Sequence, residues 1–192
     1  MKLFLVRHGQ TFSNRDGILQ GQLDTELSEL GIKQAEKVAK RLKDYTFDKV
    51  FSSDLQRASN TAKAITKFHN IEIVYDKRLR ERHFGDFGGK KRNNLDWDSL
   101  DGERWEKCPP NGESINDQIK RVKDFVDTLH SEGNVLIVSH GGTIKALVHI
   151  LLGKDLEEIT LNESPKNTGV YIIEKKDDSY ISIIENCDVH LN

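Results

Sequence analysis

Residues 2–9 read KLFLVRHG, and residues 135–142 read VLIVSHGG. Each stretch has four consecutive apolar residues, then a polar pair that ends in histidine, then glycine. Continuous apolar runs of this length, ended by glycine, are typical of strands that are buried on both faces of a sheet. The two stretches therefore predict two central strands, followed directly by His8 and His140.

Further strands and helices alternate along the rest of the chain. Short runs rich in Val, Ile, Phe and Tyr predict strands, and apolar residues at a helical period predict helices. The predicted strands are residues 2–6, 49–52, 71–75, 135–138, 170–174 and 180–185. The predicted helices are residues 28–42, 54–68, 114–130 and 143–152. This alternation predicts an α/β sandwich with a largely parallel central sheet, which ends in a hairpin around Asp177 and Asp178.

The length and continuity of the chain predict a single domain over residues 1–192. A chain of 192 residues with 36% hydrophobic residues can bury one sizeable core and is short for two. No low-complexity tract or linker divides it. Residues 85–112 have no clear period, and a loop of that length in a compact domain is commonly a lid or a binding segment. We therefore expect a lid-like segment at about residues 85–112.

The charge and the cysteines argue against several classes of protein. The 29 Lys and Arg residues nearly balance the 31 Asp and Glu residues, so a net charge of −2 gives no general attraction to nucleic acid or to an anionic membrane. The apolar run from Leu3 to Val6 is too short for a secretory signal or a membrane span. Cys108 and Cys187 lack the spacing of a redox pair or a zinc site, which predicts a reducing, cytoplasmic compartment.

Charged residues follow four successive predicted strands. Arg7 and His8 follow the first strand, Arg57 comes shortly after the second, Glu81 follows the third and His140 follows the fourth. The carboxyl ends of parallel strands lie at one edge of an open α/β sheet, where ligands bind. We therefore expect these two histidines, two arginines and one glutamate to converge.

Such a group of side chains suits a phosphate ester. Two guanidinium groups that face one point require an anion, and their planar forks match phosphate oxygens. Gly141 and Gly142 open a predicted helix, which adds backbone N–H groups and a positive dipole end. A neutral imidazole can attack phosphorus while the arginines and a second imidazole offset negative charge, and a carboxylic acid can protonate the leaving alkoxide.

Each residue also has an ordinary structural interpretation. A histidine after a strand is commonly a hydrogen-bonded core residue, an arginine near a helix start is commonly solvated, and Glu81 could pair with neighbouring arginines. Surface or packing roles are favoured for the histidines on predicted helices or at the chain end, which are His69, His130, His149 and His190. The sequence has no HxH, HExxH or acidic cluster, so no metal is expected. The residues at the four strand ends have complementary roles in phosphate chemistry, and this combination favours the catalytic interpretation.

The motifs around these residues resemble those of a known family. Residues 5–11 (LVRHGQT), 51–58 (FSSDLQRA), 79–85 (LRERHFG) and 138–142 (VSHGG) are similar, in this order, to motifs of the histidine phosphatase superfamily, phosphoglycerate mutase branch. Residues 19–24 (LQGQLD) and 27–31 (LSELG) also fit. The resemblance implies a three-layer α/β/α sandwich and a metal-independent reaction without a cofactor. Gln10, where Glu is common, and residues 87–89 (FGG) depart from the pattern.

The resemblance also implies a role for each site residue. His8 would be the nucleophile that becomes phosphohistidine, and Glu81 would act first as acid and then as base. The phosphate would be held by Arg7, Asn14, Arg57, His140 and Gly141. Gln20, Gly21 and His83 are candidate substrate contacts.

Two features favour hydrolysis of a small phosphorylated metabolite over transfer of its phosphoryl group. The chain is shorter than most mutases of the family, and residues 109–114 (PPNGES) resemble a junction of the small phosphatases. A phosphoglycerate mutase-type phosphomutase is the first alternative, and a non-catalytic protein that binds a phosphorylated ligand is the second. The sequence leaves the physiological substrate and the oligomeric state open.

Overall fold

The computed structural model describes residues 1–130, 132–161 and 164–192. Their central feature is a six-stranded sheet in the order β3-β2-β4-β1-β5-β6. The strands are β1 (Lys2–Arg7), β2 (Lys49–Ser52), β3 (Ile73–Tyr75), β4 (Asn134–Ser139), β5 (Val170–Lys176) and β6 (Ser179–Cys187). The first four pair in parallel, β5 is antiparallel to β1, and β6 closes the predicted hairpin with β5.

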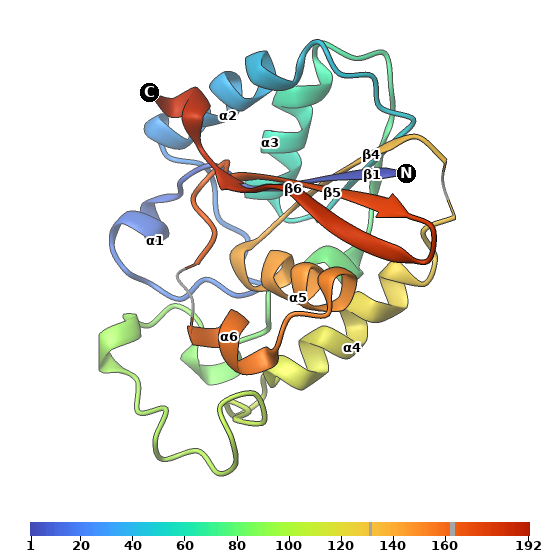
Figure 1. The fold of residues 1–192 in the computed structure, drawn as a ribbon. Helices are drawn as coiled ribbons and strands as arrows, with labels where there is room; N and C mark the ends of the chain where they lie inside the picture. Colours follow the sequence, from blue (N-terminus) through green and yellow to red (C-terminus); the bar gives the residue numbers. More distant parts are fainter. Residues whose placement is uncertain (131, 162–163) are drawn as a thin grey trace.

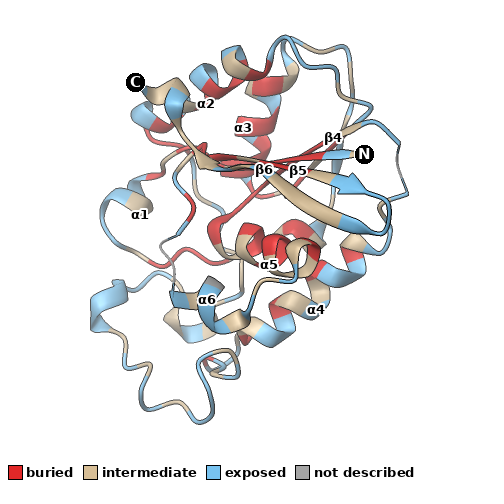
Figure 2. Cartoon of the chain, in the orientation of Figure 1, coloured by how far each residue is buried: buried red, intermediate tan, exposed pale blue. Residues whose placement is uncertain are grey.

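Helices cover both faces of this sheet, so the predicted three-layer α/β/α sandwich is confirmed (Figure 1). Helices α2 (Glu29–Leu42) and α3 (Gln56–Thr66) lie on one face, and α4 (Ile115–Val126) and α5 (Gly141–Leu152) lie on the other. Alternate residues of β1 serve the two layers: Leu3 and Leu5 pack with α4 and α5, whereas Phe4 and Val6 pack with α2 and α3. Figure 2 shows the central strands of the sheet buried between the layers.

The structure contains two short helices that the sequence pattern does not predict, α1 (Phe12–Arg15) and α6 (Leu156–Leu161). Helix α1 is a single turn, too short to show a helical period, and is held by a capping box between Thr11 and Asn14. The predicted boundaries also differ, because α4 ends at Val126 and β3 begins at Ile73. Within the described residues, no helix has the length and apolar character needed to cross a membrane.

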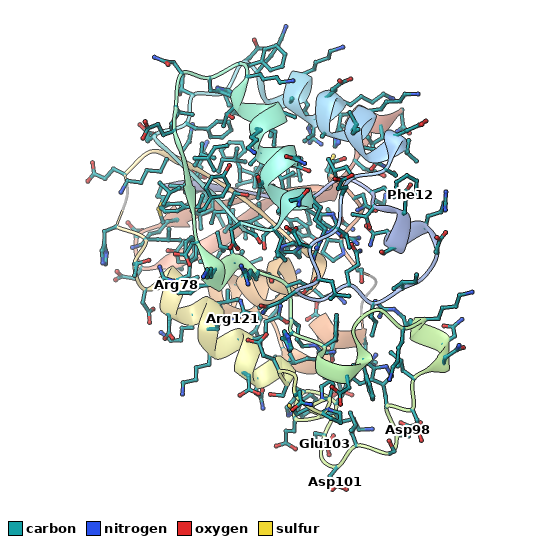
Figure 3. The ribbon with its side chains drawn as sticks, turned by 180° about the vertical axis from the view of Figure 1, so that it is seen from behind. Phe12, Arg78, Asp98, Asp101, Glu103 and Arg121 are labelled. Carbon is teal, nitrogen blue, oxygen red and sulfur yellow. The ribbon has the colours of Figure 1, made fainter. Side chains whose placement is uncertain are left out.

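Residues 85–112 project from the sandwich as a long loop with only short 3-10 turns, η2 (Gly85–Phe87) and η3 (Arg92–Asn94) (Figure 1). The two ends of the loop meet at Gly85, which has φ 49°, and a Cβ there would lie 1.9 Å from the carbonyl oxygen of Pro110. Only glycine fits such a close approach. At the far tip, the exposed acidic side chains of Asp98, Asp101 and Glu103 lie away from the sandwich (Figure 3).

Candidate active site

The carboxyl edge of the parallel strands brings the predicted residues together. Arg7 ends β1 and is in register with Ser139 at the end of β4, so His8 and His140 follow side by side, with ring centroids 5.1 Å apart. A cavity of about 210 Å³ lies here, and its lining includes Arg7, His8, Arg57 and Glu81. Four segments that are distant in the sequence therefore supply one site, as the strand-end argument predicts.

His8 has the geometry of a neutral nucleophile. Its Nδ1 lies 2.7 Å from the carbonyl oxygen of Gly9, which can only accept, so Nδ1 carries the proton and Nε2 keeps its lone pair. The side chain is buried, and burial holds the pKa of His8 well below its usual range, with Arg57 and Arg7 lowering it further. An unprotonated Nε2 is therefore present at neutral pH.

His140 is equally buried, at the N-terminal end of α5. Its Nε2 lies 2.8 Å from Ser53 Oγ. The same Oγ accepts a hydrogen bond from Leu55 N, so its own proton can be donated to Nε2, an arrangement that leaves the ring proton on Nδ1. Burial lowers the pKa of His140 well below the usual value, and Arg57 lowers it further. His140 can thus present an N–H donor from Nδ1.

The two arginines are fixed by backbone carbonyl groups. Arg7 Nη1 donates to the oxygen of Pro165 at 2.5 Å. Arg57 Nη1 and Nη2 donate to the oxygens of Leu23 and Gly21 at 2.8 and 2.7 Å. Burial lowers the pKa of Arg57 to about 10, so the group is still protonated at neutral pH. Arg57 therefore keeps its positive charge in a buried, oriented position, and the half-buried Arg7 is oriented by its bond to Pro165.

Three buried polar atoms of these residues have no hydrogen-bond partner within the described part of the chain. They are Arg7 Nε, Arg57 Nε and His140 Nδ1. A buried donor that stays unpaired costs about 1–3 kcal/mol, so such atoms call for an acceptor. An anion with several oxygens beside His8 would supply acceptors of the kind that these atoms lack, which is a physical indication of a phosphate site.

Glu81 is oriented from three directions. Its Oε2 accepts from Gly142 N at 3.0 Å, and its Oε1 accepts from Gln118 Nε2 at 3.1 Å and Arg82 N at 2.8 Å. The sequence predicts that the N–H groups of both Gly141 and Gly142 serve the phosphate, but the N–H of Gly142 binds Glu81. A Cβ at Gly142 would lie 2.4 Å from Glu81 Oε1, so the glycine gives the carboxylate its place.

The segment that carries Glu81 is held from behind by helix α4. Arg121 Nη1 donates to the backbone oxygens of Arg78 and Arg80 at 2.7 and 3.0 Å, and Figure 3 shows Arg121 next to Arg78. Glu113 pairs with Arg121 at 2.8 Å. Charge-assisted hydrogen bonds of this kind are strong, so they hold the backbone next to Glu81 firmly in place.

The other predicted ligand contacts divide into two groups. Asn14, Gln20, Gly21 and Gly141 line the cavity. Asn14 Oδ1 accepts from Thr11 N and Gln20 Oε1 accepts from Thr11 Oγ1, which leaves the amide nitrogen of each side chain available as a donor. His83 is exposed and lines a neighbouring hollow instead.

The structure adds cationic residues that the sequence analysis does not select. Arg82, Arg92 and Arg104, termed here the outer arginines, also line the cavity, as does Lys145. Within the described residues none of the outer arginines forms an ion pair with an acid. The guanidinium of Arg82 lies over the rings of Phe84 and Trp97, 4.7 and 5.2 Å from their centroids.

A sequence signal exists for only some of these residues. Lys145 comes four residues after Gly141 in a predicted helix, and this spacing puts it on the same face. Arg82 is adjacent to Glu81. Arg92 and Arg104 lie in an aperiodic loop, where the sequence does not indicate which side chains face the cavity.

Comparisons with known proteins agree with this geometry. The family model of the histidine phosphatase superfamily (branch 1) matches residues 3–186. A putative phosphoserine phosphatase 2 of Hydrogenobacter thermophilus is 37% identical, covering 88% of this chain and 87% of the relative. A phosphoglycerate mutase of Schizosaccharomyces pombe is 33% identical, covering 96% of both. The structure of a mycobacterial glucosyl-3-phosphoglycerate phosphatase in complex with VO3 has a TM-score of 0.85 and 32% identity, covering 97% of this chain and 98% of that chain. The chain belongs to the histidine phosphatase superfamily, branch 1.

Proposed function

We propose that this protein hydrolyses phosphate monoesters of small metabolites through a phosphohistidine intermediate on His8. One observation carries the proposal. A neutral His8 is surrounded by buried donors of Arg7, Arg57 and His140 that have no partner within the described residues. A phosphoryl group supplies the missing acceptors and lies within reach of the nucleophile.

In the first half-reaction, Nε2 of His8 attacks phosphorus and the ester P–O bond breaks. The leaving oxygen takes a proton from Glu81, which acts as the general acid. In the second half-reaction, Glu81 accepts a proton from water, the water oxygen bonds to phosphorus, and the P–N bond breaks. Inorganic phosphate and neutral His8 result, and Glu81 is protonated again.

The buried cations perform the electrostatic work that a metal performs in other phosphatases. Arg7 and Arg57 are charged, and His140 can donate from Nδ1, so negative charge on the transferred group is offset as it develops. We therefore propose a metal-independent reaction, in which Asn14 and Gln20 complete the contacts through their amide nitrogens.

Three features support a small anionic metabolite as the substrate. The cavity of about 210 Å³ is small, and the outer arginines add positive charge beyond that needed for one phosphate. The net charge of −2 gives no general attraction to nucleic acid. Cys108 and Cys187 are unpaired, which supports a reducing, cytoplasmic setting.

Product analysis tests the proposal against the phosphomutase alternative, which the similarity to a phosphoglycerate mutase keeps open. The enzyme is incubated with phosphorylated sugars and amino acids, and the products are followed by phosphorus NMR. We expect inorganic phosphate and the free alcohol in equal amounts. An isomerised phosphate ester that forms only after priming with a bisphosphate would identify a mutase. A failure to hydrolyse any alkyl or aryl phosphate would instead leave a phospholigand-binding protein.

A further inference from the structure

One segment outside the predicted site forms hydrogen bonds with the last residue of β1. Residues 165–169, termed here the strap, connect the region after α6 to β5. Arg7 N donates to Gly169 O at 3.4 Å, and Arg7 O accepts from Thr168 N at 3.1 Å. The guanidinium of Arg7 donates to the oxygen of Pro165. The strap thus binds both backbone polar groups of Arg7 and one end of its side chain.

The same segment holds the backbone of the nucleophile. The carbonyl oxygen of His8 accepts from Asn167 Nδ2 at 3.0 Å and from Thr168 N at 3.4 Å. Asn167 Nδ2 also lies 3.4 Å from Oδ1 of Asn14, the predicted phosphate contact. A displacement of the strap would therefore move three residues of the site together.

The strap is held by the last residues of the chain. His190 lies in the terminal 3-10 turn η4 (Val189–Leu191), which Figure 1 shows beside α2. Thr168 Oγ1 donates to Asn167 O, so it accepts from Nε2 of His190 at 3.0 Å. The other ring nitrogen of His190 accepts from Arg41 Nη1 at 3.0 Å. Neutral His190 therefore bridges α2 and the strap.

The protonation state of His190 agrees with this bridge. Burial, with a smaller contribution from Arg41, lowers the pKa of His190 to about 4, so the ring is neutral in the physiological range. A neutral ring has one donor and one acceptor, as the contacts to Thr168 and Arg41 require. Asn186 gives the strap a second attachment, because its Oδ1 accepts from Lys166 N at 2.7 Å.

Two residues at the same place have a left-handed backbone conformation. Thr168 has φ 55° and Asn186 has φ 44°. A β-branched residue at positive φ is uncommon and costs on the order of 1–3 kcal/mol. Thr168 is also completely buried. Such a conformation persists only where the surrounding contacts enforce it, and residues of this kind cluster at functional sites.

We propose that Thr168 and His190 are positioning residues, which act through the strap to hold Arg7 and His8 in the geometry for phosphoryl transfer. The inference rests on the proposed function, because it concerns the rate of that reaction. Neither side chain needs to touch the substrate. The hydroxyl of Thr168 transmits the position of the C-terminal turn to the end of β1.

The first test removes the hydroxyl of Thr168 and keeps its shape. Thr168→Val retains β-branching, and so the backbone cost of positive φ, but leaves Nε2–H of His190 without its acceptor. We expect the first-turnover rate with an aryl phosphate to fall about tenfold, as for a small misplacement of reacting groups. Thr168→Ser should recover most of that rate, because it restores the acceptor.

A double-mutant cycle with Arg7→Lys separates positioning from folding. If Thr168 acts through the fork of Arg7, Thr168→Val should cost much less than tenfold when Arg7 is already lysine. The same loss in both backgrounds would overturn the action through Arg7, and a normal rate for Thr168→Val would overturn the inference as a whole. A normal rate for Arg7→Lys alone would contradict the proposed function instead.

A variant near the chain end provides a second test in case Thr168→Val does not fold. His190→Ala should lower the first-turnover rate in the same way, without adding its full loss to that of Thr168→Val. Val189→Ala is the matched control, because Val189 is 61% exposed on the same turn. Thermal unfolding is measured for every variant. A loss for His190→Ala that is matched by Val189→Ala would show a general effect of the terminal turn and would overturn the role of His190.

Discussion

The buried group of the cavity (Arg7, His8, Arg57 and His140) and the outer arginines differ in how they are held. The buried group stands at strand ends or in the first turn of a helix, and hydrogen bonds to backbone carbonyl groups or to Ser53 fix its side chains. Arg92 and Arg104 stand on a projecting loop and are exposed. We therefore propose that phosphoryl chemistry depends on the sheet, whereas recognition of the rest of the substrate depends on the loop.

The largest expected effect on the reaction rate concerns Glu81, whose carboxylate accepts hydrogen bonds from the backbone N–H groups of Arg82 and Gly142. Glu81→Gln keeps the shape of the side chain but cannot donate a proton, so the first-turnover rate with alkyl phosphates should fall by about 10²–10⁴. Aryl phosphates should lose much less, because a phenolate leaves without much help. Stopped-flow detection of the leaving group measures both rates. Equal losses for alkyl and aryl substrates would mean that Glu81 only orients the site.

A second change tests whether the buried group recognises phosphate by geometry as well as charge. Arg57→Lys keeps the positive charge but loses the planar fork and its bonds to Leu23 and Gly21. The chemical step should slow by about tenfold to a thousandfold, as for one lost electrostatic donor. Urea unfolding is the control. Near-normal kinetics in a folded variant would place Arg57 outside the reaction.

The pH dependence of stability tests the burial of three neutral imidazoles. The folded-state pKa values of His8 and His140 lie well below the unfolded value of about 6.5, and the pKa of His190 is lowered to about 4, so the unfolded chain binds more protons in the window just below pH 6.5. Stability should therefore fall as pH drops through this window, by up to about 1.4 kcal/mol per pH unit for each histidine. Urea unfolding from pH 7.5 to pH 5 measures the slope, and His8→Gln should reduce it. A flat profile would show that these imidazoles are not held neutral.

The smallest effect is expected for the outer arginines. Arg104→Ala should raise KM about threefold to tenfold for substrates with a second anionic group and leave kcat nearly unchanged, because an exposed charge contributes mainly to binding. Glu103→Gln is the matched control, because Glu103 is adjacent and lies at the exposed tip of the loop (Figure 3). The difference between the variants should shrink at high salt. A large fall in kcat for Arg104→Ala would show that Arg104 takes part in the chemical step.

The same contrast explains what the sequence can predict. Buried strands show as apolar runs, and the parallel direction of the central strands follows from the alternation of strands and helices. The register that aligns Arg7 with Ser139 is seen only in the structure. Convergence of the strand-end residues follows from topology alone. In contrast, Arg104 lines the cavity from a loop whose sequence has no repeating pattern. The packing of Trp97 against Phe84 and Phe87 follows no periodic sequence pattern either.

His190 shows a second limit of prediction from the sequence. A histidine at a chain end predicts a surface or packing role, and the sequence does not indicate that the terminal turn returns to the start of the site. The bridge from Arg41 to Thr168 depends on α2, η4 and the strap meeting in space. Tertiary contacts of this kind, between residues far apart in the sequence, leave no local pattern.

Identification of the covalent intermediate is the most direct test of the phosphohistidine mechanism. The enzyme is mixed with substrate carrying a radioactive phosphoryl group, quenched rapidly in alkali, digested and examined for the labelled residue. The account predicts an alkali-stable, acid-labile label on His8, because a phosphorus–nitrogen bond forms there, and no label in His8→Ala. Rapid turnover without a labelled protein, or a label on His140 in place of His8, would contradict it.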